Sequence, residues 1–541
     1  MSTNGYDVVV IGAGHNGLAL AGYLARAGLT VCVLEQSDAI GGVCQTREVL
    51  PGFRGNLGTN SPHNLDPLVI RELELERYGV EWIPIPGASA AALLPGGERI
   101  IAYRDERRDP EFDQFGHGEA ERYFGLLEAM NDLGRELDVS FYDAPPSLDE
   151  VQARVPDRHR ELFDLAFFGT TRELLDRYLT TDQVKASLGM LAVVGNFVGP
   201  DTPGSAFSLM QRPLYRGARG ARDYTKSVLG TSEYAPRNVR GGLGAVTQAM
   251  GRSAQAHGAV IRTEAPVERM IVEDGRAIGV VIAGGEEVRG RAVVSAINPV
   301  QTLRELVPSS EIPADLVDYL GGVEMEGCLA KIYVGIEGEP EYLAARDEEE
   351  RQILARCGLR MGSYVDSMQA AYERAREGHF DGDPVVYCLM QTAFDDSLNP
   401  TGRHLMSMSV CFAPYHLADG MSWPEQRDNW VNHVVDWVAD NHMPNLRDII
   451  VETGGMSPDD FHRELGVYQG NALHGDVLVD TMFDRRPIPG YSDYTSPVEG
   501  LFFCSVGTWP ANYMNGLGGR NASQRVMRFL GSTAQVITPL G

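Results

Sequence analysis

Three glycines near the N-terminus have the spacing with which many proteins bind the pyrophosphate of a dinucleotide. They lie between an apolar run, 8–11, and a stretch rich in leucine and alanine, 18–27. In such a strand–turn–helix unit the first glycine allows a tight turn, the second lets the backbone approach the phosphates, and the third lets the helix pack closely on the strand. The phosphates then lie at the positive end of the helix. The predicted contacts are Gly12, Gly14, His15, Asn16 and Gly17.

An acidic residue completes this unit. A second apolar strand, 30–34, ends in Glu35, eighteen residues after Gly17. An acid about twenty residues beyond the glycines accepts hydrogen bonds from the adenosine ribose. Because strand, glycines, helix, strand and acid follow one another within the first 35 residues, the sequence predicts a dinucleotide-binding unit rather than a flexible glycine loop.

The rest of the chain must hold this unit and a substrate in place. Strand-like apolar runs cover 260–262, 267–272, 277–282, 293–297, 385–390 and 404–410, and 500–507 reads as a strand that leads into a glycine turn. Asp274–Gly275 predicts a hairpin turn between two of them. In 404–410, apolar residues alternate with small polar ones, so one face of that strand can line a cavity. Residues with helical spacing predict helices over 72–79, 119–137, 161–179 and 183–194, and from 520 onward.

Several segments resemble known flavoproteins. Gly41–Gly42, which follows the acid, resembles the glycine pair of FAD-binding, amine-oxidase-like proteins and favours FAD over NAD. Five segments together resemble the phytoene-desaturase-like family, which includes carotenoid desaturases, carotenoid isomerases, carotene ketolases and retinol saturases. These segments are 10–18, 40–46, 51–53, 241–248 and 518–522.

The resemblance implies an α/β fold with two parts. A discontinuous, Rossmann-type FAD-binding domain comprises 1–75, 240–299 and 496–541. A mixed α+β substrate domain with a helical insert comprises 76–239 and 300–495. The cofactor is expected to be non-covalent FAD. Beyond the first glycine loop and Glu35, its expected contacts are Gly41, Gly42, Thr46, Gly58, Thr59, Val267, Gly507, Gly516 and Leu517.

The same resemblance suggests where catalysis takes place. Where the family commonly has His-Pro followed by glycines, this chain has Trp509-Pro510, so we expect Trp509, Tyr513 and Asn515 beside the isoalloxazine. The two bulky rings would reshape the substrate end of the pocket, which argues against a long carotenoid. His63, in a turn-rich loop on the other side of the ring, is a candidate base because histidine exchanges protons near neutral pH.

Composition excludes several classes of partner. The chain has 47 basic and 74 acidic residues, a net charge of −27, which repels nucleic acid and anionic lipid. Seven cysteines without a CxxC pair argue against disulfides and zinc, and they indicate a reducing, cytoplasmic location. No histidine pattern predicts a metal site. Glycines interrupt both long uncharged stretches, so neither predicts a membrane span; peripheral membrane contact is left open.

These observations predict an FAD-dependent oxidoreductase that removes a hydride from a C–H bond of an apolar or mixed small molecule. No second strand–GxGxxG–helix unit follows, so oxygen, a quinone or a partner protein would reoxidise the flavin. Two alternatives remain: a non-redox isomerase that uses reduced FAD, and a binding or chaperone protein whose FAD is structural.

One charged cluster is not explained by these predictions. Arg212, Arg216, Arg219 and Arg222 lie in a glycine-punctuated segment of an otherwise acidic protein. Such a cluster is either a solvated loop or an anchor for an anionic group of the substrate.

Overall fold

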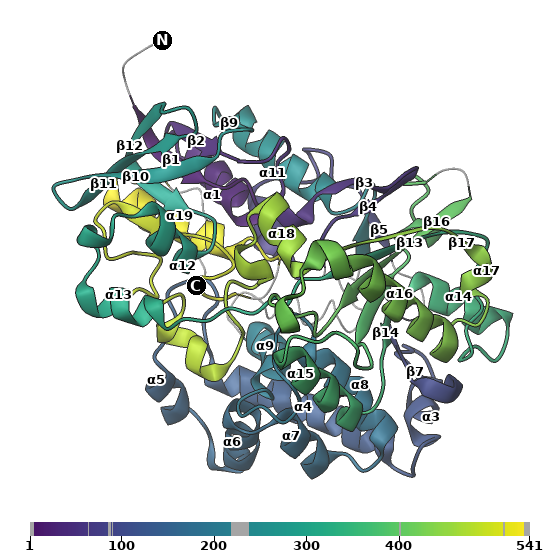
Figure 1. The fold of residues 1–541 in the computed structure, drawn as a ribbon. Helices are drawn as coiled ribbons and strands as arrows, with labels where there is room; N and C mark the ends of the chain where they lie inside the picture. The colour runs from purple at the N-terminus through teal and green to yellow at the C-terminus, as the bar shows by residue number, and fades with distance from the viewer. Residues whose placement is uncertain are drawn as a thin grey trace.

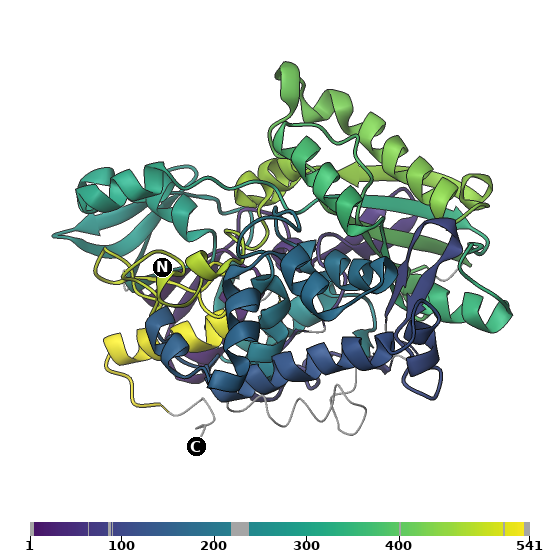
Figure 2. The same ribbon diagram turned by 90° about the horizontal axis from the view of Figure 1, so that it is seen from below.

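The computed structural model describes residues 5–62, 64–84, 88, 90–217, 237–399, 402–511 and 514–534. Two seven-stranded sheets form its framework, one at the upper left of Figure 1 and the other at the right. Helices from the first half of the chain form a layer along the lower side of the molecule and face the viewer in Figure 2. These helices are α3 (Arg108–Asp113), α4 (Glu119–Leu137), α5 (Leu148–Ala153), α6 (Arg160–Phe168), α7 (Thr171–Tyr178), α8 (Asp182–Val193) and α9 (Phe207–Gly217).

The first sheet is built from three distant parts of the chain. Its order is β10-β11-β12-β1-β2-β9, and β18 also pairs with β12. The pairs β9–β2, β2–β1, β1–β12 and β12–β18 are parallel, whereas β10, β11 and the start of β12 form an antiparallel meander. The strands are β1 (Tyr6–Ile11), β2 (Val31–Leu34), β9 (Val260–Arg262), β10 (Val267–Glu273), β11 (Arg276–Ile282), β12 (Glu287–Ser295) and β18 (Leu501–Phe503).

Both faces of this sheet are covered, as its continuous apolar strands require. Val8 and Val10 pack towards α1 (His15–Arg26), α11 (Gly244–Ala256) and α19 (Leu517–Phe529). Val9 and Ile11 pack on the other side against apolar residues of α12 (Pro299–Gln301), the π-helical turn Thr302–Leu306 and α13 (Ala314–Gly321).

The second sheet has the order β17-β13-β16-β15-β14-β6-β7. Its outer face packs on α14 (Glu348–Arg356) and α16 (Trp423–Asn441). The predicted alternation along 404–410 is confirmed, because Met406 and Met408 lie in that outer core. The strands are β6 (Ala90–Leu93), β7 (Arg99–Ile101), β13 (Lys331–Glu337), β14 (Gly358–Met361), β15 (Val386–Leu389), β16 (Arg403–Val410) and β17 (Ile450–Met456).

Smaller elements complete the described fold. Two short antiparallel pairs are β3 (Thr46–Leu50) with β4 (Phe53–Asn56), and β5 (Trp82–Pro84) with β8 (Arg237–Val239). The other helices are α2 (Pro67–Glu72), α15 (Val365–Arg376), α17 (Leu446–Ile449) and α18 (Pro458–Leu465). In the described residues, every helix is too short or too polar to span a bilayer.

The structure confirms one predicted hairpin and corrects two predicted helices. The hairpin at Asp274–Gly275 is confirmed, with both residues at positive φ. The helix predicted over 72–79 was wrong: α2 precedes it, because Asp66 caps the helix by accepting a hydrogen bond from Leu68 N at 2.7 Å and Pro67 occupies its first position. The last helix begins at Leu517, three residues earlier than predicted. The domain boundaries stay a prediction.

A buried ion pair ties together the helices on one face of the first sheet. Arg520 of α19 donates to both carboxylate oxygens of Glu72 in α2, at 2.8 and 3.1 Å. Tyr23 of α1 donates to the same carboxylate at 2.7 Å. The side chains of Arg520 and Glu72 are only 1% and 4% exposed, so water cannot replace either partner.

Replacing Arg520 should therefore destabilise the protein strongly. We expect Arg520→Met to cost about 3–5 kcal/mol, because it leaves the Glu72 charge buried and unpaired. The double variant Glu72→Gln/Arg520→Met should lose less than Arg520→Met alone. Apparent Tm measured by calorimetry checks the order, with Arg528→Met, at an exposed position of the same helix, as the control. Equal Tm values for Arg520→Met and the control would contradict the argument.

Candidate functional site

The glycine loop between β1 and α1 leaves an open place for an anion. Gly12 has φ +94°, and a Cβ on Gly17 would lie 2.2 Å from the carbonyl oxygen of Gly12, so the fold itself requires both glycines. Gly14 differs: its φ of −71° suits any residue, and a Cβ there would meet no protein atom within 4 Å. No side chain caps α1, and its first turn carries no acid. The residues therefore fit a pyrophosphate at the helix N-terminus.

Glu35 is held at the end of β2 by the backbone around it. Its two carboxylate oxygens accept hydrogen bonds from Ala13 N at 2.8 Å and Ser37 N at 2.9 Å. The main chain of Glu35 also bonds to Arg262 O and Ala265 N, each at 2.8 Å. This brings the start of β10, where Val267 lies, towards the acid that is predicted to bind the ribose.

The second glycine pair lies directly on the first loop. Gly41 N donates to Ala13 O at 2.8 Å, and a Cβ on Gly42 would lie 3.6 Å from the Cα of Gly14. The Thr46 hydroxyl accepts from Gly244 N at 2.9 Å and also lies 3.0 Å from Asn56 Oδ1, so it joins β3 to the turn before α11. Thr46 thus has a positioning role in addition to its predicted cofactor contact.

The C-terminal helix meets the same loop. Gly516, at φ +78°, precedes Leu517, the first residue of α19. Gly519 N lies 3.4 Å from Asn16 Oδ1, and a Cβ on Gly519 would lie 2.2 Å from the Asn16 carbonyl oxygen. The two helices α1 and α19 therefore begin side by side. Gly507 lies in the turn after β18, where its N–H donates to Ser505 Oγ at 3.0 Å.

Two of the predicted catalytic residues are described, and both are held by main-chain hydrogen bonds. Trp509 is fully buried, and its indole N–H donates to Ser140 O at 3.0 Å. Its ring packs against Phe141 and Phe483, with centroid distances of 5.1 and 5.4 Å. Asn515 accepts a hydrogen bond from the N–H of Leu517, the first residue of α19, at 2.7 Å. Tyr513 and His63 lie outside the described residues.

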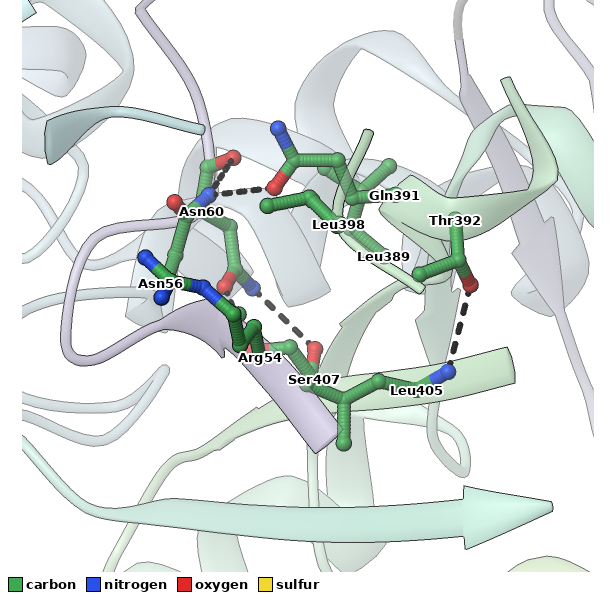
Figure 3. Close-up of a pocket in the computed structure, with 10 residues that line it drawn as sticks. Arg54, Asn56, Asn60, Leu389, Gln391, Thr392, Leu398, Leu405 and Ser407 are labelled. Atoms are coloured by element: carbon green, nitrogen blue, oxygen red, sulfur yellow. Dashed lines mark hydrogen bonds between the residues drawn. The ribbon is translucent and has the colours of Figure 1, made fainter. Parts of the chain in front are cut away.

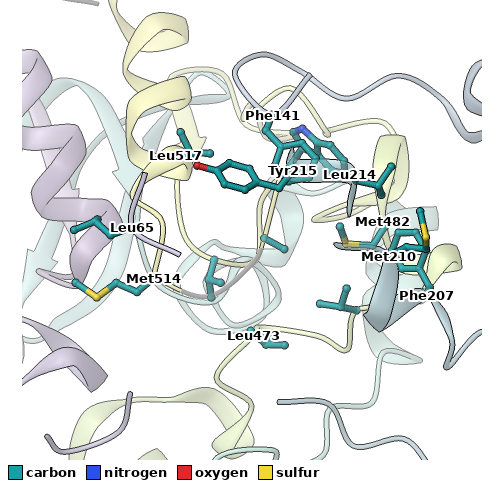
Figure 4. Close-up of a cluster of buried hydrophobic side chains, with 14 of the residues drawn as sticks. Leu65, Phe141, Phe207, Met210, Leu214, Tyr215, Leu473, Met482, Met514 and Leu517 are labelled. Atoms are coloured by element: carbon teal, nitrogen blue, oxygen red, sulfur yellow. The ribbon is translucent and has the colours of Figure 1, made fainter. Parts of the chain in front are cut away.

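Apolar side chains from many elements gather near these two residues. Figure 4 shows α9 contributing one group of them, with the start of α19 and the loops around it contributing the others. Because these residues are far apart in the sequence, only the packed fold produces this apolar region. Its members include Leu65, Phe141, Phe207, Met210, Leu214, Tyr215, Leu473, Met482, Met514 and Leu517.

Lys331 is a candidate functional residue that the sequence reasoning missed. It opens β13, is fully buried, and makes no ion pair in the part of the chain that the structure describes. Its Nζ lies 2.6 Å from Asn60 Oδ1 and 3.3 Å from Ser409 Oγ. Burial away from water lowers the pKa of Lys331 to about 7, so the amine is neutral in much of the population at physiological pH.

Asn60 connects Lys331 to the loop predicted to flank the flavin. It follows Gly58 and Thr59, whose N–H groups both donate to Val43 O, beside the second glycine pair. Its own amide donates to Ser407 O at 3.2 Å on β16. Figure 3 shows Asn60 beside Asn56, Gln391 and Ser407 in a small polar pocket. The loop and the second sheet therefore meet at Asn60 and Lys331.

The composition contained a signal for Lys331. It is one of only three lysines among the 47 basic residues. Arginine remains charged in proteins, whereas a buried lysine readily loses its proton. A lysine at the start of an apolar strand, in a chain that otherwise uses arginine, is therefore a candidate proton acceptor.

Comparisons with known proteins support a flavin site. The family model described as flavin containing amine oxidoreductase matches residues 17–444. The rat pyridine nucleotide-disulfide oxidoreductase domain-containing protein 2 is 30% identical, over 97% of this chain and 94% of its own. Phytoene desaturase (lycopene-forming) of Pseudescherichia vulneris is 25% identical, over 93% and 94%. A triple mutant of putrescine oxidase has a similar fold, with a TM-score of 0.62, 16% identity, and coverage of 98% and 99%.

The geometry of Gly14 gives a direct test of the cofactor loop. Gly14→Val should leave the fold intact, since a Cβ at this position meets no protein atom within 4 Å, but it should lower FAD affinity at least about tenfold by blocking the phosphates. The flavin content of purified protein and fluorescence titration of the apoprotein measure this. Gly17→Ala, the matched variant, should lower apparent Tm as well. A Gly14→Val protein that keeps full flavin occupancy would refute the predicted pyrophosphate position.

Proposed function

The chain belongs to the flavin containing amine oxidoreductase family and is an FAD-dependent oxidoreductase, and we propose that it removes a hydride from a C–H bond of an apolar or mixed small molecule. The product would carry a new C=C or C=X bond. The single observation that carries this proposal is the fully buried Lys331 beside Asn60, whose pKa burial lowers to about 7. The phytoene desaturase among its relatives bears the name of a reaction of this type.

When bound, FAD supplies the hydride acceptor, so the protein need only orient the substrate, exclude water and take up a proton. A neutral lysine has two N–H donors and one lone pair. Asn60 Oδ1 and Ser409 Oγ can accept the two N–H bonds, which leaves the lone pair for a proton. We therefore assign Lys331 the role of proton acceptor.

The other predicted roles remain part of the proposal. Gly12, Gly14, Gly17 and Glu35 would hold the pyrophosphate and ribose, and the glycine pair at 41–42 would support them. Trp509 and Asn515 would border the flavin ring through the turn that they stabilise. His63 stays a candidate base, but Lys331 takes precedence because its burial lowers its pKa to about 7. Nothing in the family match or among these relatives favours the two alternatives, isomerisation or a structural flavin.

We also propose a reducing, cytoplasmic location. All seven cysteines are free, and six of them are buried. Free thiols persist where glutathione and thioredoxin keep cysteines reduced. The proposed partner is a small-molecule substrate.

The function is tested with the yellow holoenzyme and the ligand that co-purifies with it, identified by mass spectrometry. Anaerobic mixing of fresh enzyme with that compound should bleach the flavin band stoichiometrically. NADPH alone should not, because no second dinucleotide unit follows the first. Rapid, complete reduction of the flavin by NADPH alone in stopped flow would contradict our proposal that electrons pass from the substrate to the flavin.

Replacing Lys331 should slow the chemical step without releasing FAD. Removing a general base typically lowers the rate of the chemical step about 10²- to 10⁴-fold. The rate of flavin reduction should fall by about this factor in Lys331→Met and stay at the wild-type value in Lys185→Met. In the wild type, the rate should rise with pH and level off above about 7, as Lys331 loses its proton. The Lys331→Met profile should be flat in this range.

The pKa itself can be measured independently of turnover. Protein labelled with [ε-¹³C]lysine should give three signals, one for each lysine. One signal should titrate near pH 7 and be absent from Lys331→Met. Three signals that all titrate near 10.5, the ordinary lysine value, would remove Lys331 as the base.

A further inference from the structure

A polar row crosses the inner face of the second sheet, the face away from α16. The strand register pairs Lys331 with Ser409, Ser409 with Tyr387, and Tyr387 with Arg360. Directly paired residues on neighbouring strands point to the same face. Their sequence neighbours point the other way, into the outer core: Ile332, Met408, Cys388 and Leu359. At about 4.8 Å for each strand, Arg360 lies about 14 Å along the sheet from Lys331.

The guanidinium of Arg360 has no acidic partner among the described residues. Its Nε is buried without a hydrogen bond, and in the described part of the chain Arg360 forms no ion pair. Tyr123, Tyr387 and a second cation, Arg212, are near enough to affect Arg360 electrostatically. Burial and the charge of Arg212 both lower the pKa of Arg360. A Cβ on Gly358 would lie 2.7 Å from the Tyr387 hydroxyl, so a glycine there leaves room for this phenol.

Two buried arginines of this protein are paired with acids, and a third, Arg486, donates its hydrogen bonds to main-chain carbonyl oxygens. Arg520 is paired with Glu72, and Arg99 lies 2.5 Å from Glu350 and 3.8 Å from Glu111. Arg360 is half-buried with its Nε shielded from water, the second cation Arg212 is exposed, and no acid in the described residues neutralises Arg360. Such an arrangement is stabilised when a bound anion supplies the missing charge.

We propose that Arg360 and Arg212 bind the anionic end of the substrate, a carboxylate or a phosphate, with Tyr387 and Tyr123 as further hydrogen-bond donors. This rests on the proposed function for the position of the reacting carbon, near Lys331 at the other end of the row. The substrate is therefore an elongated molecule with one anionic end about 14 Å from the carbon that is oxidised.

The placement of these residues supports this orientation. Arg360 and Tyr387 come from the sheet, whereas Tyr123 and Arg212 come from α4 and α9 of the helical layer. Arg212 is exposed, so the anionic end lies towards solvent. The arginine cluster in the sequence thus divides: Arg212 lies near enough to act electrostatically on Arg360, whereas Arg216 lies 3.4 Å from Asn131 Oδ1, and Arg219 and Arg222 are outside the described residues.

Calorimetric titration of the holoenzyme with decanoate, decyl phosphate and 1-decanol tests the site. At least one of the two anions should bind tenfold or more tightly than the alcohol, and the tighter anion identifies the head group. Arg360→Met should weaken the binding of that anion at least about tenfold and leave the binding of 1-decanol unchanged. Arg360→Lys should restore part of the lost affinity for the anion. Arg403→Met, at the exposed end of β16, is the control. Equal binding of all three probes, or of the anion by wild type and Arg360→Met, would overturn the proposal.

Thermal unfolding separates a binding role from a structural one. Arg360→Met removes an unpaired charge, so its apparent Tm should equal or exceed that of the wild type; a clear decrease would show that Arg360 holds the fold together. The titrations do not depend on turnover. If the wild-type enzyme binds the anion but substrate does not bleach its flavin, only the proposed function is refuted. If substrate bleaches the flavin but the anion does not bind preferentially, only the anion site is refuted.

Discussion

The close contact between backbones at the start of α1 is the constraint on which the rest of the structure depends. Gly17 allows α1 to lie against the turn at Gly12, and Gly519 allows α19 to lie against Asn16. A side chain at Gly17 or Gly519 would overlap a main-chain atom, which cannot move without moving the helix. Since β1 also pairs with β2 and β12, the first, middle and last parts of the chain are all positioned from this one point.

Charged groups with little access to water have different partners in different parts of the molecule. Between α2 and α19, Glu72 and Arg520 neutralise each other and tie helices together. On the inner face of the second sheet, Lys331 and Arg360 have no such partner in the described chain, and the ionised form of each is destabilised by burial. Removing one partner of the first pair would leave a buried charge unpaired, whereas we propose that the unpaired groups of the second take up a proton and bind an anion. This contrast distinguishes the framework from the proposed site.

Side chains along the strands of the second sheet alternate between an apolar outer face and a more polar inner face. Along β16, methionines fill the outer core, and serines lie on the face that carries Lys331. The period of two in a strand thus produces a wholly apolar layer under α16 and a polar row facing the helical layer. Both arise from the same eight residues, Arg403–Val410.

Local patterns in the sequence determined much of this fold. The glycine spacing, Glu35, the Asp274–Gly275 hairpin and the alternation in β16 were predictable because each depends on residues close together in the chain. The first turn of α2 was missed although Asp66-Pro67 signalled it. Only the tertiary structure brought Asn60 to Lys331, 271 residues away, and aligned Lys331 with Arg360 across four strands. Strand order and register are set by packing among distant segments, so no single stretch of sequence encodes them.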